Sequence, residues 1–303
     1  MTYQEFKKAI GKNPLVFHAY QLIFRVLLEP MNRGHRIEFF FKYLNWFLLQ
    51  KRRGECTEIL LLNNMKSIVY PDSDSGVSSI FSNNVDHHES VFVRSHLKPG
   101  DFIVDAGCNV GNRTLVLADI VGGGLLIDAN PNCLSRARKN FQLNSLSLDN
   151  FHFFESAVGC ENSTVKFPVD TGTSCQNRIN DTSDSGNLVE VPLTTLDTAL
   201  ENIGMPAVSF VKTDLEGYDL DALRGARQIL QSNTIRLVLF ERWATTKLDD
   251  FLQFFTEIDW CVFALDKHGQ PSVSPGLLAH SRNLFASPNR LRHEFFGSSP
   301  LSV

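Results

Sequence analysis

Acidic side chains close several short apolar runs of the sequence, and their positions indicate shared chemistry. Each run has the length and aliphatic composition of a buried strand. In an open α/β sheet the carboxyl ends of parallel strands meet at one edge, and ligands bind there. We therefore expect five carboxylates to converge on a positively charged ligand: Asp105, Asp128, Asp214, Glu216 and Glu241.

A glycine turn follows the first of these acids. The run that contains Asp105 leads into Gly107 and Gly111, and the apolar residues of 114–118 have helical spacing, which predicts a strand, a tight turn and a helix. Dinucleotide sites use three glycines in the pattern G-x-G-x-x-G, whereas this turn has two. An acid beside the turn suits a cation such as S-adenosylmethionine, which carries a sulfonium and no phosphate. A purely structural turn is the alternative interpretation.

The second acid extends this interpretation to a nucleoside. Asp128 comes 23 positions after Asp105, which is where acids of nucleotide-binding folds accept hydrogen bonds from ribose hydroxyls. Asn130 and Pro131 follow and have the types of an N-cap and a first helical residue. The alternative interpretation of Asp128 is a solvated strand end.

Two further strands are predicted downstream. Apolar residues at helical spacing over 220–230 separate the run that ends in Asp214 and Glu216 from the run that ends in Glu241. Lys212 lies two positions before Asp214, so both side chains share one face of the strand. Lys212 can therefore pair with an acid or only support the strand, and we favour support.

These motifs together resemble the FkbM family of methyltransferases, which use S-adenosylmethionine. The most family-specific string is Lys-x-Asp-x-Glu-Gly, whereas the first glycine turn is shared by methyltransferases generally. Asp128 stands where the family usually has Glu, which predicts a looser or water-bridged ribose contact, and Cys108 replaces a usual alanine. The matching pieces span roughly residues 90–245 and are Asp105–Gly111, Asp128–Pro131, Asn140 with Asn144, Ala157–Gly159, Leu196 with Asp197, Lys212–Gly217, Gly225 with Ala226, and Glu241.

The resemblance implies a fold and a cofactor site. The fold is the α/β, Rossmann-like class I methyltransferase fold, with a seven-stranded, mostly parallel sheet, helices on both faces and, here, a helical N-terminal appendage. The cofactor is S-adenosyl-L-methionine, with Ser156 and Ala157 beside the adenine. The expected cofactor-binding residues are Asp105, Gly107, Asn109, Gly111, Asp128, Ala129, Ser156 and Ala157.

The predicted chemistry needs alignment and a base. Methyl transfer is an in-line displacement, so a protein mainly aligns the reactants, and a hydroxyl acceptor needs a base within hydrogen-bond reach. The predicted catalytic residues are Asp214, Glu216 and Glu241, and neighbouring carboxylates can share a proton, which raises the pKa of one of them. In the alternative, one acid only positions the methionine amine and another caps the following helix. No metal is expected.

The expected activity is O-methylation of a hydroxyl of a sugar, glycan or glycolipid precursor, and this substrate class rests on the resemblance alone. One rival is a nicotinamide-dependent oxidoreductase, which the missing third glycine disfavours. Another is a non-catalytic binding or scaffold protein that retains the methyltransferase fold. Nucleic acid is not expected as a partner, because the predicted catalytic domain is acidic and the sequence lacks an Asn/Asp-Pro-Pro-Tyr string.

The first 54 residues differ in charge from the remainder. They hold ten Lys or Arg and three Glu, a net charge of +7, which leaves −11 for the rest of a chain whose total is −4. Helical spacing predicts an appendage that packs on the main domain or on a second copy in a homo-oligomer. A sharper alternative is contact between the basic amphipathic segment 37–53 and an anionic membrane surface. A first helix is predicted over 15–27, ended by Pro30. The apolar face of a second helix consists of Ile37, Phe40, Phe41, Leu44, Phe47 and Leu48, widened by Phe39, Tyr43 and Trp46.

Composition sets the remaining expectations. The 303 residues are 43% apolar and 20% charged, which is typical of a globular chain. The six cysteines form no C-x-x-C pair, so we expect reduced thiols and a cytoplasmic protein, peripheral to the inner face of a membrane if segment 37–53 binds there. The predicted organisation is a helical appendage over 1–54, a connecting hairpin and loop region over 55–90, a methyltransferase domain over 91–290 and a tail over 291–303.

Overall fold

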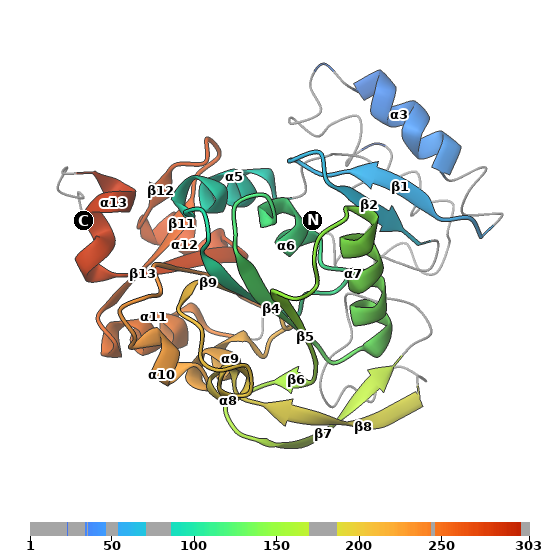
Figure 1. Cartoon of the computed structure of the whole chain (residues 1–303). Helices are drawn as coiled ribbons and strands as arrows, with labels where there is room; N and C mark the ends of the chain where they lie inside the picture. The colour runs from blue at the N-terminus through green and yellow to red at the C-terminus, as the bar shows by residue number, and fades with distance from the viewer. Residues whose placement is uncertain are drawn as a thin grey trace. The chain divides into compact units, whose positions relative to one another are not determined.

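The computed structural model of the chain describes residues 36–46, 54–70, 86–169, 187–243 and 246–297, together with the single residues 23 and 34. The chain divides into two compact units, Met1–Val85 and Asp86–Val303 (Figure 1). Among the described residues, no helix has the length and apolar character needed to cross a membrane.

The first unit contains one described helix and one hairpin. Strands β1 (Thr57–Leu60) and β2 (Lys66–Val69) pair antiparallel. In the turn between them, the N–H of Leu61 donates to the Met65 oxygen and the N–H of Asn64 donates to the Leu61 oxygen, and Asn64 adopts a positive φ of 63°. The hairpin expected across Asn63 and Asn64 is therefore confirmed.

Helix α3 (Arg36–Asn45) buries a different face from the one expected. Phe39, Tyr43 and Trp46 are buried, whereas Ile37 and Phe41 are 75% and 61% exposed. Both sets recur at helical spacing, and the three residues thought only to widen the apolar face form the buried one. Both sets contain aromatic side chains, so periodicity does not choose between them and the packing partner decides which face is buried. Apart from the single residue Ile23, the helix predicted over 15–27 lies outside the described residues.

The second unit is built on a sheet with strand order β12-β11-β13-β10-β9-β3-β4-β5. The five strands from β10 to β5 are parallel, and β13 runs antiparallel to both of its neighbours, β10 and β11. The strands are β3 (Phe102–Ala106), β4 (Gly123–Asp128), β5 (Phe151–Glu155), β9 (Val208–Thr213), β10 (Leu237–Glu241), β11 (Trp260–Leu265), β12 (Pro271–Ser272) and β13 (Asn283–Pro288).

This order confirms the Rossmann-like class I methyltransferase architecture, with one correction to the number of strands. The sheet has eight strands rather than seven. The additional strand is β12, in which Pro271 and Ser272 pair with Leu265 and Ala264 after the turn at Gly269. Two residues without the apolar alternation of a strand give no sequence signal of their own.

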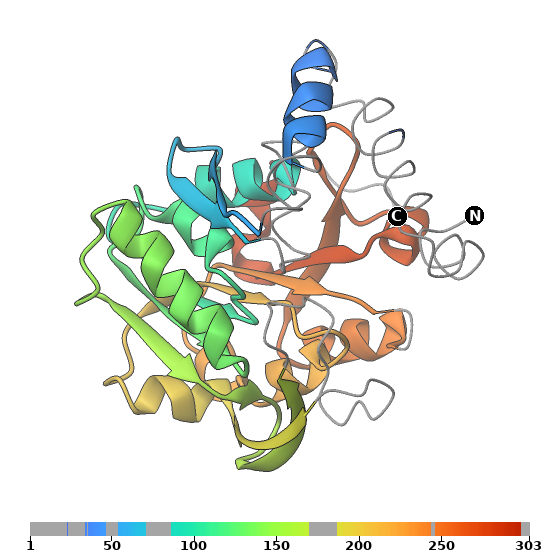
Figure 2. The same ribbon diagram turned by 90° about the vertical axis from the view of Figure 1, so that its right-hand side faces the viewer.

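Helices cover both faces of the sheet (Figures 1 and 2). Helices α6 and α7 lie on one face, and α8 to α11 lie on the other, where aromatic and aliphatic side chains of α11 and α9 pack against β10. The stretch expected as a C-terminal tail includes a 3₁₀ turn and α13. The bounds are α5 (His87–His96), α6 (Asn112–Leu117), α7 (Pro131–Leu143), α8 (Leu196–Glu201), α9 (Asp219–Arg224), α10 (Arg227–Leu230), α11 (Leu248–Glu257), α12 (Pro275–His280), η4 (Asn289–Leu291) and α13 (Arg292–Phe296).

A small three-stranded sheet lies beside the carboxyl end of β5. It consists of β6 (Ala157–Val158), β8 (Asn187–Thr194) and β7 (Ser163–Val169), in that order. The sequence of residues 164–169 predicts one strand followed by a polar loop. The strand is confirmed as β7, and residues 170–186 lie outside the described residues.

Candidate active site

The turn after β3 requires glycine for a specific contact. Gly107 has a φ of +75°, and a Cβ at this position would stand 2.1 Å from the backbone oxygen of Asp214. No side chain can approach a carbonyl oxygen so closely, so glycine alone lets the end of β3 lie against the end of β9. Gly111, with a φ of +78°, precedes α6. The predicted strand, turn and helix are confirmed.

The N–H groups of this turn are occupied within the protein. Gly107 and Cys108 donate to the backbone oxygen of Ile127 at 2.9 and 3.1 Å. The N–H of Asn109 donates to Asp128 Oδ2 at 2.9 Å. A pyrophosphate needs such groups pointed at it, so their use inside the fold disfavours a dinucleotide cofactor.

Asp105 lies in the interior, on the same face of the sheet as α6. Its Oδ2 accepts a hydrogen bond from Thr114 Oγ1 at 2.8 Å, and its Oδ1 lies 3.5 Å from Lys212 Nζ. Asp105 and Lys212 are direct partners in the β3–β9 register. Asp105 therefore balances the charge of the buried Lys212. The sequence indicates that Lys212 can pair with an acid, because it lies in a predicted strand that ends in acidic residues.

Asp128 stands at the carboxyl end of β4 and is already hydrogen-bonded to its own surroundings. Its two oxygens accept the N–H groups of Asn109 and Asn130, at 2.9 and 2.8 Å. Burial raises the pKa of Asp128 to about 6, although both hydrogen bonds favour its charged form. Each carboxylate oxygen retains acceptor capacity beyond one such bond, so the side chain can still receive a hydroxyl.

Residues expected beside the adenine follow at the end of β5. The Ser156 hydroxyl donates to the backbone oxygens of Ala157 and Pro192, at 2.8 and 2.9 Å, and it is buried. Ala129 and Ala157 are buried in a small apolar cluster with two side chains of β7 and β8. Ser156 thus ties the end of β5 to β8 of the small sheet, and its hydroxyl is engaged within the protein.

Lys212 links two of the predicted acids. Its Nζ lies 3.2 Å from Asp214 Oδ2 and 3.5 Å from Asp105 Oδ1, and its side chain is only 8% exposed. Burial opposes the charge of Lys212, but the carboxylates of Asp214 and Asp105 outweigh burial and raise its pKa. Burial likewise opposes the charge of Asp214, yet the Lys212 ammonium prevails and lowers the pKa of Asp214. Pairing, rather than strand support alone, is the role that the structure gives to Lys212.

The three predicted catalytic carboxylates converge at one place. Single oxygen atoms of Asp214, Glu216 and Glu241 all lie within 4.8 Å of one another. Glu216 reaches this position from the left-handed region, with a φ of +54°. Among the described residues, this group also has a spacing that could hold a metal ion. Lys212 and Arg282 already bring two positive charges to it, so the arrangement does not require a metal.

Glu241 is the most perturbed member of this group. Burial and then the nearby Asp214 carboxylate raise the pKa of Glu241 to about 7, and Arg282 opposes both effects. A hydrogen bond with Glu241 also stabilises ionised Asp214. The sequence predicts that neighbouring carboxylates share a proton. The raised pKa of Glu241 indicates that this proton resides mainly on Glu241.

Three side chains near the clustered acids are not predicted from the sequence: Arg282, Trp243 and Arg113. Arg282 forms an ion pair with Glu241 through Nε, and Trp243 donates to the same carboxylate at 2.8 Å. Arg113 of α6 is bonded to Ser90 and Asp86, at 2.8 and 2.6 Å, and its charge helps to lower the pKa of Asp214. Trp243 lies two positions after Glu241, which is a usable signal, whereas Arg282 and Arg113 reach the edge only through tertiary packing.

Asp219 is a further acid that the motifs do not single out. It accepts from Thr213 Oγ1 at 2.7 Å and from the N–H groups of Leu215 and Glu241 at 3.3 Å each. Burial raises the pKa of Asp219 to about 6. Asp219 thus fastens the loop after β9 to the end of β10, and this loop carries Asp214 and Glu216.

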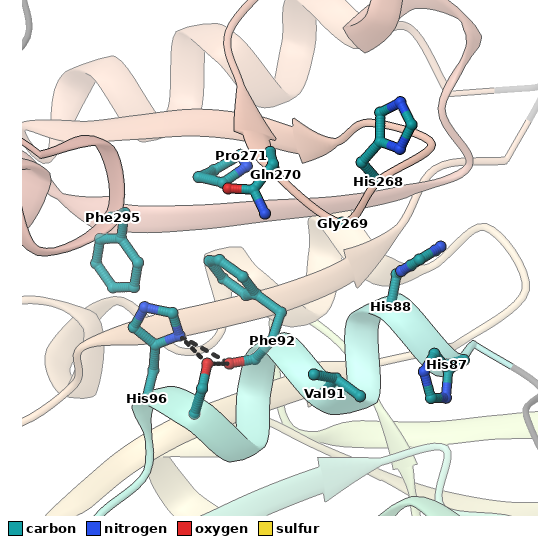
Figure 3. Close-up of a pocket in the computed structure, with 11 residues that line it drawn as sticks. His87, His88, Val91, Phe92, His96, His268, Gly269, Gln270, Pro271 and Phe295 are labelled. Atoms are coloured by element: carbon teal, nitrogen blue, oxygen red, sulfur yellow. Dashed lines mark hydrogen bonds between the residues drawn. The ribbon is translucent and has the colours of Figure 1, made fainter.

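A separate cavity of about 320 Å³ lies on the other side of α5 (Figure 3). Its lining combines imidazoles with aromatic rings, and the rings of Phe92, His96 and Phe295 pack against one another in tilted pairs, with centroids 4.3 to 6.0 Å apart. Residues Ser90 and Asp86, which hold Arg113, come from the opposite side of the same helix. None of the predicted site residues lines this cavity.

Strand order, glycine turn and converging acids together define a class I methyltransferase. The methyltransferase FkbM domain matches residues 105–262, which is more than half of the chain. The chain therefore belongs to the FkbM family of methyltransferases. It is an S-adenosylmethionine-dependent methyltransferase.

Solved structures with a similar fold have low sequence identity to this chain. An rRNA methylase from Streptococcus thermophilus is 13% identical, with a TM-score of 0.39, over 66% of this chain and 93% of that one. Precorrin-6y C5,15-methyltransferase from Geobacter metallireducens GS-15 is 10% identical, with a TM-score of 0.40, over 67% and 87%. TrmK from M. capricolum, in complex with S-adenosylhomocysteine, is 11% identical, with a TM-score of 0.37, over 69% and 74%. A comparison with curated protein sequences gives no match.

The residues present fit the cofactor. The edge supplies carboxylates at the carboxyl ends of β4, β9 and β10, which suit a sulfonium and an ammonium. The turn offers no set of free N–H groups for a diphosphate, because Ile127 and Asp128 accept them. Asp128 presents an acceptor at the position that nucleotide-binding folds use for ribose.

Proposed function

We propose that this enzyme transfers a methyl group from S-adenosylmethionine to a hydroxyl oxygen of a sugar, glycan or glycolipid precursor. The observation that carries the proposal is the convergence of Asp214, Glu216 and Glu241 within 4.8 Å, with the pKa of Glu241 raised to about 7. A general base works best when its pKa lies near the working pH. The acceptor class comes from the FkbM family resemblance.

The cofactor, when bound, supplies a methyl group on a cationic sulfur, and a neutral thioether leaves as the acceptor oxygen bonds to the methyl carbon. The acidic edge favours the positive charge before transfer. One of its carboxylates takes the proton of the acceptor hydroxyl, which makes the oxygen a competent nucleophile. Closely spaced carboxylates can also hold neighbouring hydroxyls of a polyol as hydrogen-bond acceptors.

We assign the remaining roles by position. Asp128 accepts the ribose hydroxyls, while Gly107, Asn109 and Gly111 shape the turn beside the methionine portion. Asp105 acts through Lys212, which fixes Asp214, so its part is to position rather than to touch the cofactor. The backbone near Ser156, Ala129 and Ala157 borders the adenine. Asp214 and Glu216 face the reacting atoms together with Glu241.

A labelled-methyl assay tests this proposal. The purified enzyme is incubated with methyl-labelled S-adenosylmethionine and, separately, with monosaccharides, nucleotide sugars, glycolipid extracts and total RNA. We expect label in an ether of a sugar-containing fraction. We also expect Asp214→Asn to lower turnover more than cofactor affinity. Label in RNA alone would contradict the acceptor class and the expected exclusion of nucleic acid. If no fraction accepts the labelled methyl group, the alternative of a non-catalytic binding or scaffold protein would be favoured.

We further propose that α3 contacts an anionic membrane surface. Ile37 and Phe41 lie one turn apart on α3 and are 75% and 61% exposed, with Arg36 and Lys42 adjacent in the sequence. The net charge of +7 over residues 1–54 favours anionic lipid. This would place the enzyme at the inner face of a membrane, where glycolipid precursors occur.

Vesicle sedimentation tests the membrane contact. Binding to vesicles of phosphatidylcholine with phosphatidylserine should exceed binding to phosphatidylcholine alone. The double variant Ile37→Ser with Phe41→Ser should lower the partition coefficient about tenfold, because two large apolar side chains no longer leave water. Val91→Ser, at an exposed site on α5, is the control. Equal sedimentation of the double variant and the wild type would refute the contact and favour packing on a second copy.

A further inference from the structure

Glu241 is held from two sides by donors that come from different elements. Its Oε2 accepts from the indole Nε1 of Trp243 at 2.8 Å, just after β10. Its Oε1 forms an ion pair with Nε of Arg282, just before β13. Because Glu241 is buried, these two donors fix the plane and the direction of its carboxylate.

Trp243 and Arg282 also contact each other. The guanidinium carbon of Arg282 lies 5.1 Å from the centroid of the Trp243 ring, which is a cation–π distance. The backbone fixes this arrangement, because Glu241 pairs with Asn283 in the β10–β13 register and Arg242 N–H donates to the Arg282 oxygen at 2.8 Å. The two side chains form a bracket around Glu241, and we call Trp243 and Arg282 the carboxylate bracket.

Most other charges that face Glu241 are negative. Asp214 and Glu216 approach from the loop after β9, and the Asp219 carboxylate accepts the backbone N–H of Glu241 at 3.3 Å. Glu89 of α5 reaches the same neighbourhood through Asn283, at 3.3 Å. Lys212 is committed to Asp214 and Asp105, and Arg242 donates to backbone oxygens at Ala279 and Ser281. Arg282 is therefore the cation in direct contact with the Glu241 carboxylate.

We propose that Glu241 is the general base among the three clustered acids, and that Arg282 and Trp243 are positioning residues that hold its carboxylate toward the reacting atoms. Activated nucleophiles commonly use a base that a third group orients, and the carboxylate bracket is such a group. Asp214 is less suited to accept a proton, since its pairing with Lys212 stabilises its ionised form. This inference rests on the proposed function and assigns the proton in it: the acceptor O–H proton moves to a Glu241 oxygen as the acceptor oxygen bonds to the methyl carbon.

The ionisation of Glu241 can be measured without knowing the acceptor. S-adenosylmethionine carries a sulfonium charge, whereas S-adenosylhomocysteine lacks it and is otherwise closely similar. Ionisation of Glu241 adds a negative charge close to the sulfonium position and strengthens binding of the first ligand relative to the second. Protonation of Asp128 affects both ligands alike, because both carry the same ribose, so the ratio of the two dissociation constants removes that contribution.

The test is calorimetric titration of both ligands from about pH 5.5 to about pH 8.5. In the wild type, the Kd of S-adenosylhomocysteine divided by that of S-adenosylmethionine should rise about three- to tenfold with pH, with a midpoint near the pKa of Glu241, about 7. Glu241→Gln should abolish this rise. Persistence of the rise in Glu241→Gln would show that another group titrates there and would overturn the assignment.

Variants of the carboxylate bracket separate positioning from simple structure. Arg282→Gln should move the midpoint up by about one pH unit, because an adjacent cation favours the carboxylate and its exposure limits the effect. Arg282→Lys should return the midpoint toward the wild type, and Trp243→Phe should give a smaller upward shift by removing one donor. Arg224→Gln, which breaks an exposed ion pair with Asp221, is the control and should leave the midpoint unchanged. Unshifted midpoints in Arg282→Gln and Trp243→Phe would overturn the positioning roles.

Failure of the inference can be told from failure of the proposed function. If neither ligand binds the wild type, the proposed function fails. If both bind and their affinity ratio stays constant with pH, Glu241 is not the titrating base and only the inference fails.

Discussion

Two cations neutralise the acidic edge, and they do so in different environments. Lys212 is almost fully buried and lies 3.5 and 3.2 Å from Asp105 and Asp214. Arg282 has a side chain that is 62% exposed, and it pairs with the buried Glu241. The interior pair, Lys212 with Asp105, is surrounded by the sheet and α6. The outer pair, Arg282 with Glu241, has its guanidinium exposed to solvent.

This difference separates a cation that stabilises the fold from a cation that influences the protonation of a site residue. A buried charge left without its partner is costly, so Lys212 and its acids must remain together for the edge to form. The guanidinium of Arg282 is exposed, so water screens its attraction to Glu241 and this pair contributes less to stability than the interior one. Arg282 can therefore influence the protonation of Glu241 without being needed for folding, and this is what a proton-accepting group requires.

The largest expected effect comes from breaking the interior pair. Lys212→Met leaves Asp105 buried without a counter-ion and should lower the free energy of unfolding by about 3–5 kcal/mol. Urea unfolding followed by circular dichroism measures this loss. Lys247→Met, at an exposed position, is the matched control. An unfolding midpoint equal to that of the wild type would show that Lys212 does not hold this edge together.

The contact between the turn and β9 is the next feature to break. Gly107→Ala places a Cβ at 2.1 Å from the Asp214 oxygen, so the loop with Asp214 must shift. We expect S-adenosylmethionine affinity to fall ten- to a hundredfold, corresponding to a strain of about 1–3 kcal/mol. Gly100→Ala has a φ of +88° but open space around its Cβ, so it isolates the backbone strain. Equal losses in the two variants would mean that the close contact is unimportant.

The buried acids predict how stability depends on pH. The pKa of Asp128 and of Asp219 is raised to about 6, and that of Glu241 to about 7. The native state therefore binds more protons than the unfolded state between about pH 4.5 and pH 7, and stability falls as the pH rises through this window. Glu241 alone should add about 1–2 kcal/mol to the free energy of unfolding when the pH drops from about 7.5 to 5.5.

Denaturant unfolding of the ligand-free protein at both pH values checks this dependence. The variant Glu241→Gln should reduce the difference between pH 5.5 and pH 7.5, since its amide does not titrate. A difference as large as that of the wild type would place the titrating group elsewhere.

The smallest expected effect belongs to the outer pair. Arg282→Gln should change the free energy of unfolding by less than about 1 kcal/mol at neutral pH, because the guanidinium is exposed. The same urea measurement serves for Lys212→Met and Arg282→Gln, so the two sides of the edge are compared directly. A loss for Arg282→Gln as large as that for Lys212→Met would remove the distinction between them.

Much of the edge could be predicted from sequence because its signals are local. Each strand that carries an acid is a short apolar run, and parallel strands bring their carboxyl ends together whatever lies between them in the sequence. The cap at Asn130 was also predictable, and its side chain accepts from the N–H of Asn132 at 3.0 Å. Local signals of this kind can be interpreted without knowledge of the tertiary structure.

The counter-ions and the buried face of α3 could not be predicted in the same way. Arg282 meets Glu241 only because β13 runs antiparallel beside β10, and Arg113 is held by α5, which lies more than 20 positions earlier. On α3, Phe39 and Phe41 both fit helical periodicity, so the packing partner decides which one is buried. These contacts depend on pairing between elements, which periodicity does not encode.

The central claim is that the acidic edge holds the sulfonium cofactor, with Asp128 on its ribose, and one titration tests it most directly. Calorimetry should show S-adenosylmethionine binding to the wild type at one site per chain. Asp128→Ala should weaken this binding at least about tenfold, since buried ribose hydroxyls would lose their acceptor. Absence of binding to the wild type, or wild-type affinity in Asp128→Ala, would contradict the account.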